Sequence, residues 1–159
     1  MPAFYTIVPG AIQTTNATPL TANDCFFIVP GTGRSVWVKS IYPEGRGALL
    51  TSISGITYRL EKWFTTASSG GTAVTPTPNA TNYTASKHTA GWAVATVTSG
   101  TGGPTLMLSI GSGATSPGNW IAPTLDEAYE ADVLTTSLDI FCASGAASMN
   151  FELSVGTVE

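Results

Sequence analysis

The shortage of long polar side chains constrains the fold of this 159-residue chain more than any motif in it. A helix at a protein surface needs a polar face, usually built from Glu, Lys, Arg and Gln, which also favour helix formation. The whole chain has 13 of these residues, against 17 glycines and 10 prolines, which break helices. Thr and Ser occupy 40 positions, and threonine favours strands, as do valine, isoleucine and the aromatic residues. The composition therefore predicts an all-β protein with Thr and Ser on its outer faces.

The same composition limits what the chain can bind or catalyse. Charged residues make up 10% of it, against about 25% in a typical soluble domain. The net charge of −4 argues against a nucleic-acid partner. One histidine and two cysteines provide little for metal or nucleophilic chemistry, so we predict no catalytic residue, no cofactor and no metal.

The sequence pattern predicts neither a membrane-spanning helix nor a secreted protein held together by disulfides. No apolar run reaches the roughly 20 residues of a membrane helix, and the first residues lack the basic segment of a secretory signal, so we predict no membrane partner. Cys25 and Cys142 both lie in apolar runs, which predicts two buried free thiols. A disulfide stays an alternative if their strands are neighbours.

Alternation of apolar and polar residues predicts about eight strands in a single antiparallel β-sandwich of jelly-roll type. The clearest strand spans residues 56–64, with Ile56, Tyr58 and Leu60 on one face and Arg59 and Glu61 on the other. In segment 34–42, Val36 and Val38 are expected on one face, and Trp37, Lys39 and Ile41 on the other. The remaining predicted strands are 25–29, 49–54, 92–98, 105–110, 138–142 and 149–155, and residues 119–122 are a short strand or the start of one.

The last two predicted strands are expected to pair as a C-terminal hairpin around a turn that contains Gly145. In the second of them the alternation points four side chains inward: Met149, Phe151, Leu153 and Val155. Residues 123–134 are the one serious helix candidate, because Thr124 and Glu127 have capping-box spacing. An acidic edge strand that ends at Val133–Leu134 explains the same residues equally well.

Two segments do not fit the strand pattern. Residues 1–24 predict an N-terminal arm ahead of a sandwich domain at 25–159, and the Thr- and Pro-rich residues 65–91 predict a long loop of extended backbone. Residues 64–86 carry no charged side chain, although a free soluble monomer would be expected to place charge there. We therefore predict that other subunits cover both segments, with these interface residues: Phe4, Tyr5, Ile7, Val74, Pro76, Pro78, Tyr83 and His88.

Three groups of residues could carry chemistry, and each has a plainer explanation. His88 has no neighbouring nucleophile or base in the sequence, so a loop or interface role is favoured. The acidic cluster of residues 126–132 could supply a glycosidase carboxylate pair, but a solvated acidic face is favoured. The four tryptophans could form a sugar-stacking platform, although core or interface packing is favoured: Trp37, Trp63, Trp92 and Trp120.

Several segments together resemble a known class of virion protein. They are residues 34–38 (Arg-Ser-Val-Trp-Val), the strand at 56–64, the Ser-Gly-Gly-Thr loop within residues 68–76, and the closing segment from Leu138 through residues 149–155 to the final acid. This layout is similar to the small β-sandwich head decoration or cement proteins of tailed bacteriophages, over about two-thirds of the chain from residue 34 on. Residues 1–24 and 126–132 have no counterpart in it.

The resemblance implies a structural protein on the outer surface of a phage capsid that bridges neighbouring capsomers. It implies two partners, the major capsid protein and further copies of the chain in a homotrimer, and no catalytic residues. A carbohydrate-binding module of a tail or head fibre is the alternative, since a sandwich with four tryptophans would also allow it.

Overall fold

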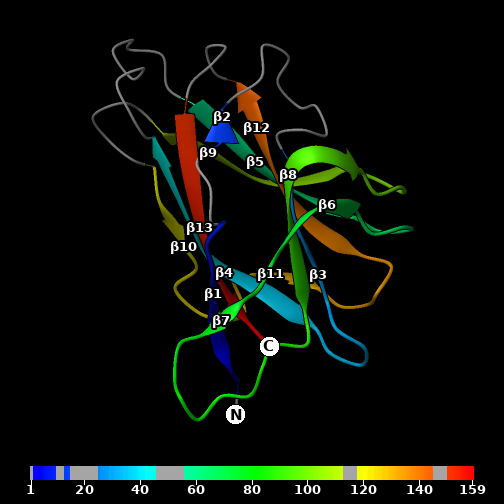
Figure 1. Ribbon diagram of the computed structural model, residues 1–159, viewed down its shortest axis with the longest axis vertical. Coiled ribbons are helices and arrows are strands. Elements are labelled where there is room, and N and C mark those ends of the chain that lie inside the picture. The colour runs from blue at the N-terminus through cyan, green and yellow to red at the C-terminus, as the bar shows by residue number, and fades with distance from the viewer. Residues whose placement is uncertain (1, 10–12, 15–24, 46–55, 113–117, 145–149) are drawn as a thin grey trace.

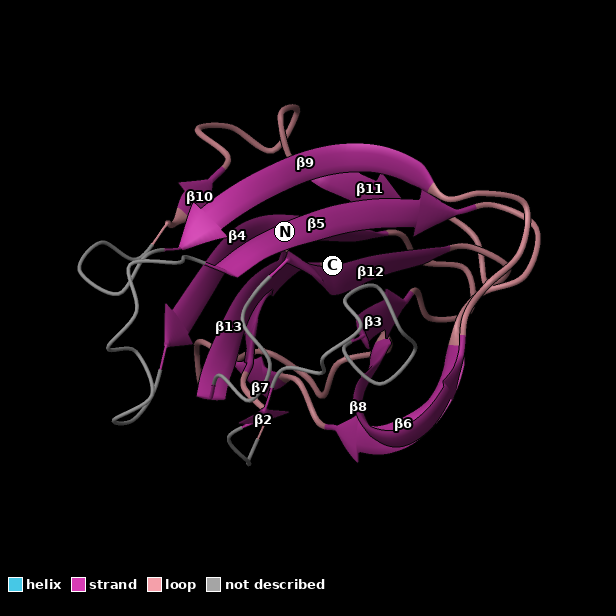
Figure 2. Cartoon of the chain, turned by 90° about the horizontal axis from the view of Figure 1, so that it is seen from above, coloured by secondary structure: helices cyan, strands magenta, loops and turns pink. Residues whose placement is uncertain are grey.

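The chain folds into two antiparallel β-sheets that pack face to face (Figures 1 and 2). The computed structural model describes residues 2–9, 13–14, 25–45, 56–112, 118–144 and 150–159, and these form 13 strands and no helix. The prediction of an all-β protein is confirmed, and its sheets are antiparallel as expected.

The first sheet has seven strands in the order β10–β4–β13–β1–β7, with β11 also paired to β4 and β2 paired to β13. Its strands are β1 (Phe4–Ile7), β2 (Gln13–Thr14), β4 (Val36–Gly45), β7 (Thr77–Pro78), β10 (Trp120–Ile121), β11 (Tyr129–Ala131) and β13 (Asn150–Val158). The second sheet has six strands in the order β6–β8–β3–β12–β5–β9. They are β3 (Cys25–Val29), β5 (Ile56–Trp63), β6 (Ser69–Val74), β8 (Thr89–Thr98), β9 (Thr105–Ser112) and β12 (Ser137–Ser144).

The main core lies between the two sheets and follows the predicted alternation. Tyr58 and Leu60 face it from β5, and Leu153 and Val155 face it from β13, all nearly fully buried. Val36 and Val38 face it from β4 as expected, but so does Ile41, which was predicted on the opposite face. The pairing of β4 with β13 shifts between Gly156–Ser40 and Thr157–Val38, so a β-bulge at Lys39 reverses the in–out pattern.

The prediction of an N-terminal arm was wrong for residues 4–7. They form β1, which pairs with both β13 and β7, and Tyr5 and Ile7 are buried. Four residues are too few to show a convincing alternation, so the sequence did not reveal this strand. The rest of the predicted arm, residues 10–12 and 15–24, lies outside the described residues.

The prediction of one long loop over residues 65–91 was wrong, although much of this backbone is extended as expected. It contains β6, β7 and the first residues of β8. The predicted C-terminal hairpin was also wrong, because β12 and β13 belong to different sheets. In the 123–134 segment, residues 129–131 form the edge strand β11 and no helix forms.

Some predictions fall where the structure describes too little to judge them. The predicted strand 49–54 and the side chains of Met149 and Phe151 lie outside the described residues. Cys25 pairs with Phe141, the residue before Cys142, so the two cysteines belong to neighbouring strands. Their side chains are not described, and their state stays a prediction.

Candidate functional site

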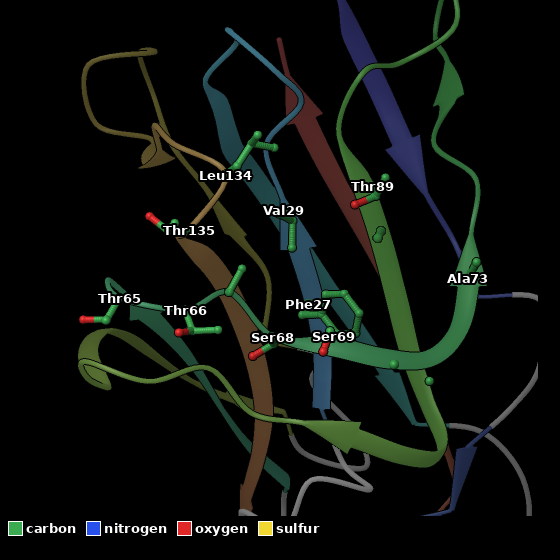
Figure 3. Close-up of a pocket in the computed structure, with 14 residues that line it drawn as sticks. Phe27, Val29, Thr65, Thr66, Ser68, Ser69, Ala73, Thr89, Leu134 and Thr135 are labelled. Carbon is green, nitrogen blue, oxygen red and sulfur yellow. The ribbon is translucent and has the colours of Figure 1, made fainter.

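The outer face of the six-stranded sheet is partly covered by two connections of the chain. Residues 64–68, here called the strap, lead from β5 past β12 and β3 towards β6 (Figure 3). Residues 99–104 return from β8 to β9, and the two connections pair with each other. The Thr65 N–H donates to the Thr101 carbonyl at 2.9 Å, and the Thr101 N–H donates to the Thr66 carbonyl at 3.0 Å.

Ser68 fastens the strap to the sheet. Its N–H donates to Ser137 Oγ at 3.1 Å, its hydroxyl donates to the Asp139 carboxylate, and its Oγ accepts the Gly100 N–H at 2.8 Å. Ser68, Ser137 and Asp139 are each at most 2% exposed. The hydroxyl of Ser68 therefore joins both covering connections to β12.

Asp139 has a second buried carboxylate beside it. Glu61 is its register partner on β5 and is 6% exposed. Burial raises the pKa of Glu61, and the charge of Arg59 partly offsets the rise. The sequence pattern placed Glu61 on a solvated face, but the covering connections remove it from water.

Apolar side chains fill the space beneath the strap. Phe27 and Phe141 are buried there and pack with Val29 and Trp63, forming a second small hydrophobic cluster outside the main core. Glycine is required where the backbone crosses this cluster. A Cβ on Gly100 would lie 2.3 Å from the Thr66 carbonyl oxygen and 2.7 Å from Trp63 Cβ.

Beside the strap the same face is hollowed into a groove of about 610 Å³. Phe27, Val29 and Thr89 form its floor, β6 forms one wall, and the strap and the turn at Leu134–Thr135 form the rest (Figure 3). No charged side chain lines it. We call this groove, the strap and residues 133–135 the strap face.

Three large apolar side chains of the strap face are exposed, and Leu134 among them lines the groove. Phe64 is 46%, Val133 50% and Leu134 52% exposed. One ion pair borders them, with Lys62 Nζ 3.5 Å from the Asp132 carboxylate and 5.3 Å from the centre of the Phe64 ring. A neutral groove with an apolar rim is suited to burying protein surface, not to holding a charged substrate.

A second polar cluster lies at the end of the molecule where the two termini meet (Figure 1). The side-chain carboxylate of Glu159 accepts the backbone N–H groups of Lys87 at 2.9 Å and His88 at 3.2 Å. It also lies 2.8 Å from His88 Nδ1. Because a carboxylate only accepts, Nδ1 carries the hydrogen, and Nε2 accepts from the Thr157 hydroxyl at 3.0 Å.

The order Thr157–His88–Glu159 matches the connectivity of a hydrolytic triad, but its position does not. The His88 side chain is fully buried and Thr157 is 1% exposed, so no substrate carbonyl can reach the hydroxyl. Burial lowers the pKa of His88 although Glu159 pulls it upward. Burial alone would raise the pKa of Glu159, but the hydrogen bonds from His88 and from the backbone together outweigh it, so the pKa is lowered. The cluster acts as a clamp that holds residues 86–88 against β13.

The predicted interface residues separate into two groups. Tyr5, Ile7, Pro76 and His88 are buried within the chain itself, so an interface role does not fit their side chains. Phe4 and Pro78 are exposed, and Val74 and Tyr83 are half-buried. The structure does not bring these eight residues to one surface. Residues 65–68 of the strap, β6 and Thr89 lie in the segment 65–91 that was predicted to be covered. Phe64, Val133 and Leu134 were missed, because exposed apolar side chains in turns have no period that would mark them.

The tryptophans do not form a shared platform. Trp92 is buried in the main core against Phe26, and Trp63 packs in the small cluster under the strap. Trp120 stacks on Tyr129 with ring centres 5.0 Å apart. Trp37 lies between the inward-facing Val36 and Val38, and so it points to the outer face of the other sheet.

The acidic residues 126–132 are spread along a turn and β11. Among the described residues, no group of three or more His, Cys, Asp or Glu side chains is placed to hold a metal ion. Within the same residues, no helix is long and apolar enough to cross a membrane.

Comparison with known proteins gives no relative. No family model matches the sequence, and neither a curated protein nor a solved structure is significantly similar to it.

Proposed function

We propose that this protein is a structural virion component, a decoration or cement protein that binds the outer surface of a phage head and stabilises contacts between capsomers. The observation that carries the proposal is the strap face, an uncharged groove whose lining includes the exposed Leu134, with the exposed Phe64 and Val133 directly next to lining residues in the sequence. Exposed apolar side chains gathered around a groove mark a protein-binding surface more often than a free one.

The construction of this face supports the same proposal. Ser68 and the pairing between the strap and residues 99–104 hold the face in one shape. A pre-ordered surface loses little conformational entropy when it binds. A cement protein needs such an area and shape, and it needs no reactive group.

The position of the polar clusters agrees with a role without catalysis. Asp139 lies beneath the strap and His88 lies inside the clamp, both nearly inaccessible to solvent. Their hydrogen bonds fasten the strap and residues 86–88 to the sheets. Asp139 therefore supports the strap face, and His88 holds residues 86–88 in place.

Co-sedimentation with purified phage heads tests the proposal. We expect the wild-type chain to pellet with the heads and to saturate. Leu134→Lys should abolish or strongly weaken this binding, because it places a charge on the neutral rim. Val8→Lys is the matched control, since Val8 is also exposed, at 44%, but lies outside the strap face. Equal binding by both variants, or no binding by the wild type, would contradict the proposal.

The same protein preparations can be applied to a glycan array. Glycan binding that is lost on a single Trp→Ala substitution would support the carbohydrate-binding alternative in place of the cement role. We expect no such binding, because Trp92 is buried in the main core, Trp63 packs under the strap, and the four tryptophans form no shared platform.

A further inference from the structure

A cationic pocket lies beside the clamp, away from the strap face. It has a volume of about 330 Å³, and its lining includes the cationic Arg34 and Lys87, the carboxylate-bearing Glu159, and Tyr83. Arg34 and Lys87 are exposed and account for two of the six cationic residues in the chain. Two cationic side chains against one carboxylate leave the pocket with a net positive charge, which favours an anionic occupant.

The walls of this pocket are firmly held. The Lys87 N–H is bound by the Glu159 carboxylate, and the Tyr5 hydroxyl donates to the Thr84 carbonyl at 3.1 Å. The turn that carries Arg34 packs on the same segment, since a Cβ on Gly31 would lie 2.5 Å from the Lys87 carbonyl oxygen. The nearest carboxylate, that of Glu159, is already engaged by two backbone N–H groups and His88.

An acidic turn with an exposed carboxylate lies elsewhere in the chain. Residues 122–128 form a turn between β10 and β11, closed by a hydrogen bond from the Ala128 N–H to the Leu125 carbonyl at 3.0 Å. Glu127 is occupied within this turn by Thr124. Asp126 is exposed, and Ile121 beside the turn is 54% exposed.

The turn and the part of the pocket formed by Tyr83 and Lys87 lie towards opposite edges of the seven-stranded sheet, whereas Arg34 lies just before β4. β10 and β11 pair with one side of β4, whereas the strands β1 and β7 lie beyond β13 on its other side. The turn therefore cannot reach Tyr83 and Lys87 of its own chain across these strands. Apolar surface accompanies the charge of the turn, since Ile121 is exposed beside it.

We propose that the Arg34–Lys87 pocket receives the Asp126 turn of a second copy of this chain. The contact is heterologous, because it joins two different surfaces, so repeating it produces a closed ring or an open chain of copies. This inference rests on the proposed function, in which several copies assemble on the shell, and it names the surfaces by which they would touch.

Charge reversal and charge exchange test the contact, with sedimentation velocity at low salt as the readout. We expect the wild-type chain to self-associate at micromolar concentration, and more weakly at high salt. Arg34→Glu alone and Asp126→Arg alone should each raise the dissociation constant by at least about tenfold, because like charges then meet. The double variant should associate again. Ser109→Glu, an added charge at an exposed position on β9, is the control and should associate like the wild type.

Several outcomes would overturn the inference: a monomeric wild type, single variants that associate normally, or a double variant that does not recover. Because both substituted side chains are exposed, misfolding is not expected, and the recovery of the double variant excludes it as the cause. Co-sedimentation with phage heads separates this inference from the proposed function. A wild type that binds heads as a monomer refutes only the contact, and one that self-associates without binding heads refutes only the cement role.

Discussion

Replacing Glu159 by glutamine should destabilise the fold, although Glu159 is the last residue of the sequence. Its carboxylate accepts hydrogen bonds from two backbone N–H groups and from His88 Nδ1, at 2.8–3.2 Å. A hydrogen bond to a charged group contributes about 1.5–3 kcal/mol. Glutamine keeps one acceptor oxygen but turns an NH₂ group towards these donors. We therefore expect a loss of about 2–4 kcal/mol in the free energy of unfolding at pH 7.

Urea unfolding and calorimetry measure this loss. For a domain of this size, 1 kcal/mol corresponds to about 2–4 °C in Tm, so the expected fall is about 5–15 °C. Glu130→Gln is the matched control, because Glu130 lies half-exposed on β11, and it should change Tm little. A Glu159→Gln variant as stable as this control would refute the clamp.

The pH dependence of the same comparison follows from the directions of the two pKa shifts. The pKa of Glu159 is lowered in the folded state, so its contribution is present above its ordinary value of 4.5 and is lost as the pH falls through the folded value. The pKa of His88 is also lowered, so stability is lost as the pH falls below about 6.5. Acid should therefore destabilise the wild type, and the difference between wild type and Glu159→Gln should shrink below pH 4.5.

Three further substitutions test the strap and what lies beneath it. Ser68→Ala should lower the unfolding free energy by about 2–3 kcal/mol, because it leaves buried polar partners without their hydrogen bond. The control Ser69→Ala, at an exposed position, should lower it by almost nothing. Equal losses for the two variants in urea titrations would argue against the role of Ser68 in fastening the strap. Gly100→Ala should lower the unfolding free energy by about 2 kcal/mol or more and should lower Tm with it. Gly111→Ala, where a Cβ would meet nothing within 4 Å, should lower neither; a Gly100→Ala protein as stable as the wild type would refute the close crossing. Glu61→Gln should stabilise the protein by about 1 kcal/mol at pH 7, because the pKa of Glu61 is raised in the folded state and its ionisation therefore opposes folding as the pH rises. This gain should vanish at pH 4, and a variant with a lower Tm than the wild type at neutral pH would contradict the reasoning.

Alternation along the sequence was enough to find the long strands. In β5 and β13 the buried side chains Tyr58, Leu60, Leu153 and Val155 are the ones that the period of two predicts. Alternation gives the wrong face where the pairing is irregular, as at the Lys39 bulge. It does not reveal a strand that is too short to show a period, such as β1. Alternation also says nothing about which sheet a strand joins, which is why β12 and β13 were predicted to pair.

The candidate sites depend on contacts between distant parts of the chain. Ser68 and Asp139 are 71 residues apart, as are His88 and Glu159, and no local pattern links either pair. One local feature could have indicated the crossing of the strap. The glycines at positions 100, 102 and 103 lie where backbone approaches backbone or a tryptophan ring, and clusters of glycine often mark such close approach.

The absence of charge from residues 64–86 gains a structural explanation. Part of this segment forms the strap and β6, which border the groove, and the remainder includes β7 and lies near the clamp. A neutral surface loses little solvation free energy when a partner covers it, since no ion has to leave water. The low charge of the chain is therefore suited to a surface that is buried on assembly.

The thermal stability of the shell itself tests the cement role most directly. Heads depleted of this protein are heated in a calorimeter alone, with the wild-type chain, and with Leu134→Lys. The account predicts that the wild type raises the temperature at which the shell opens, and that Leu134→Lys raises it much less. A shell transition that is unchanged by saturating wild-type protein would contradict the account.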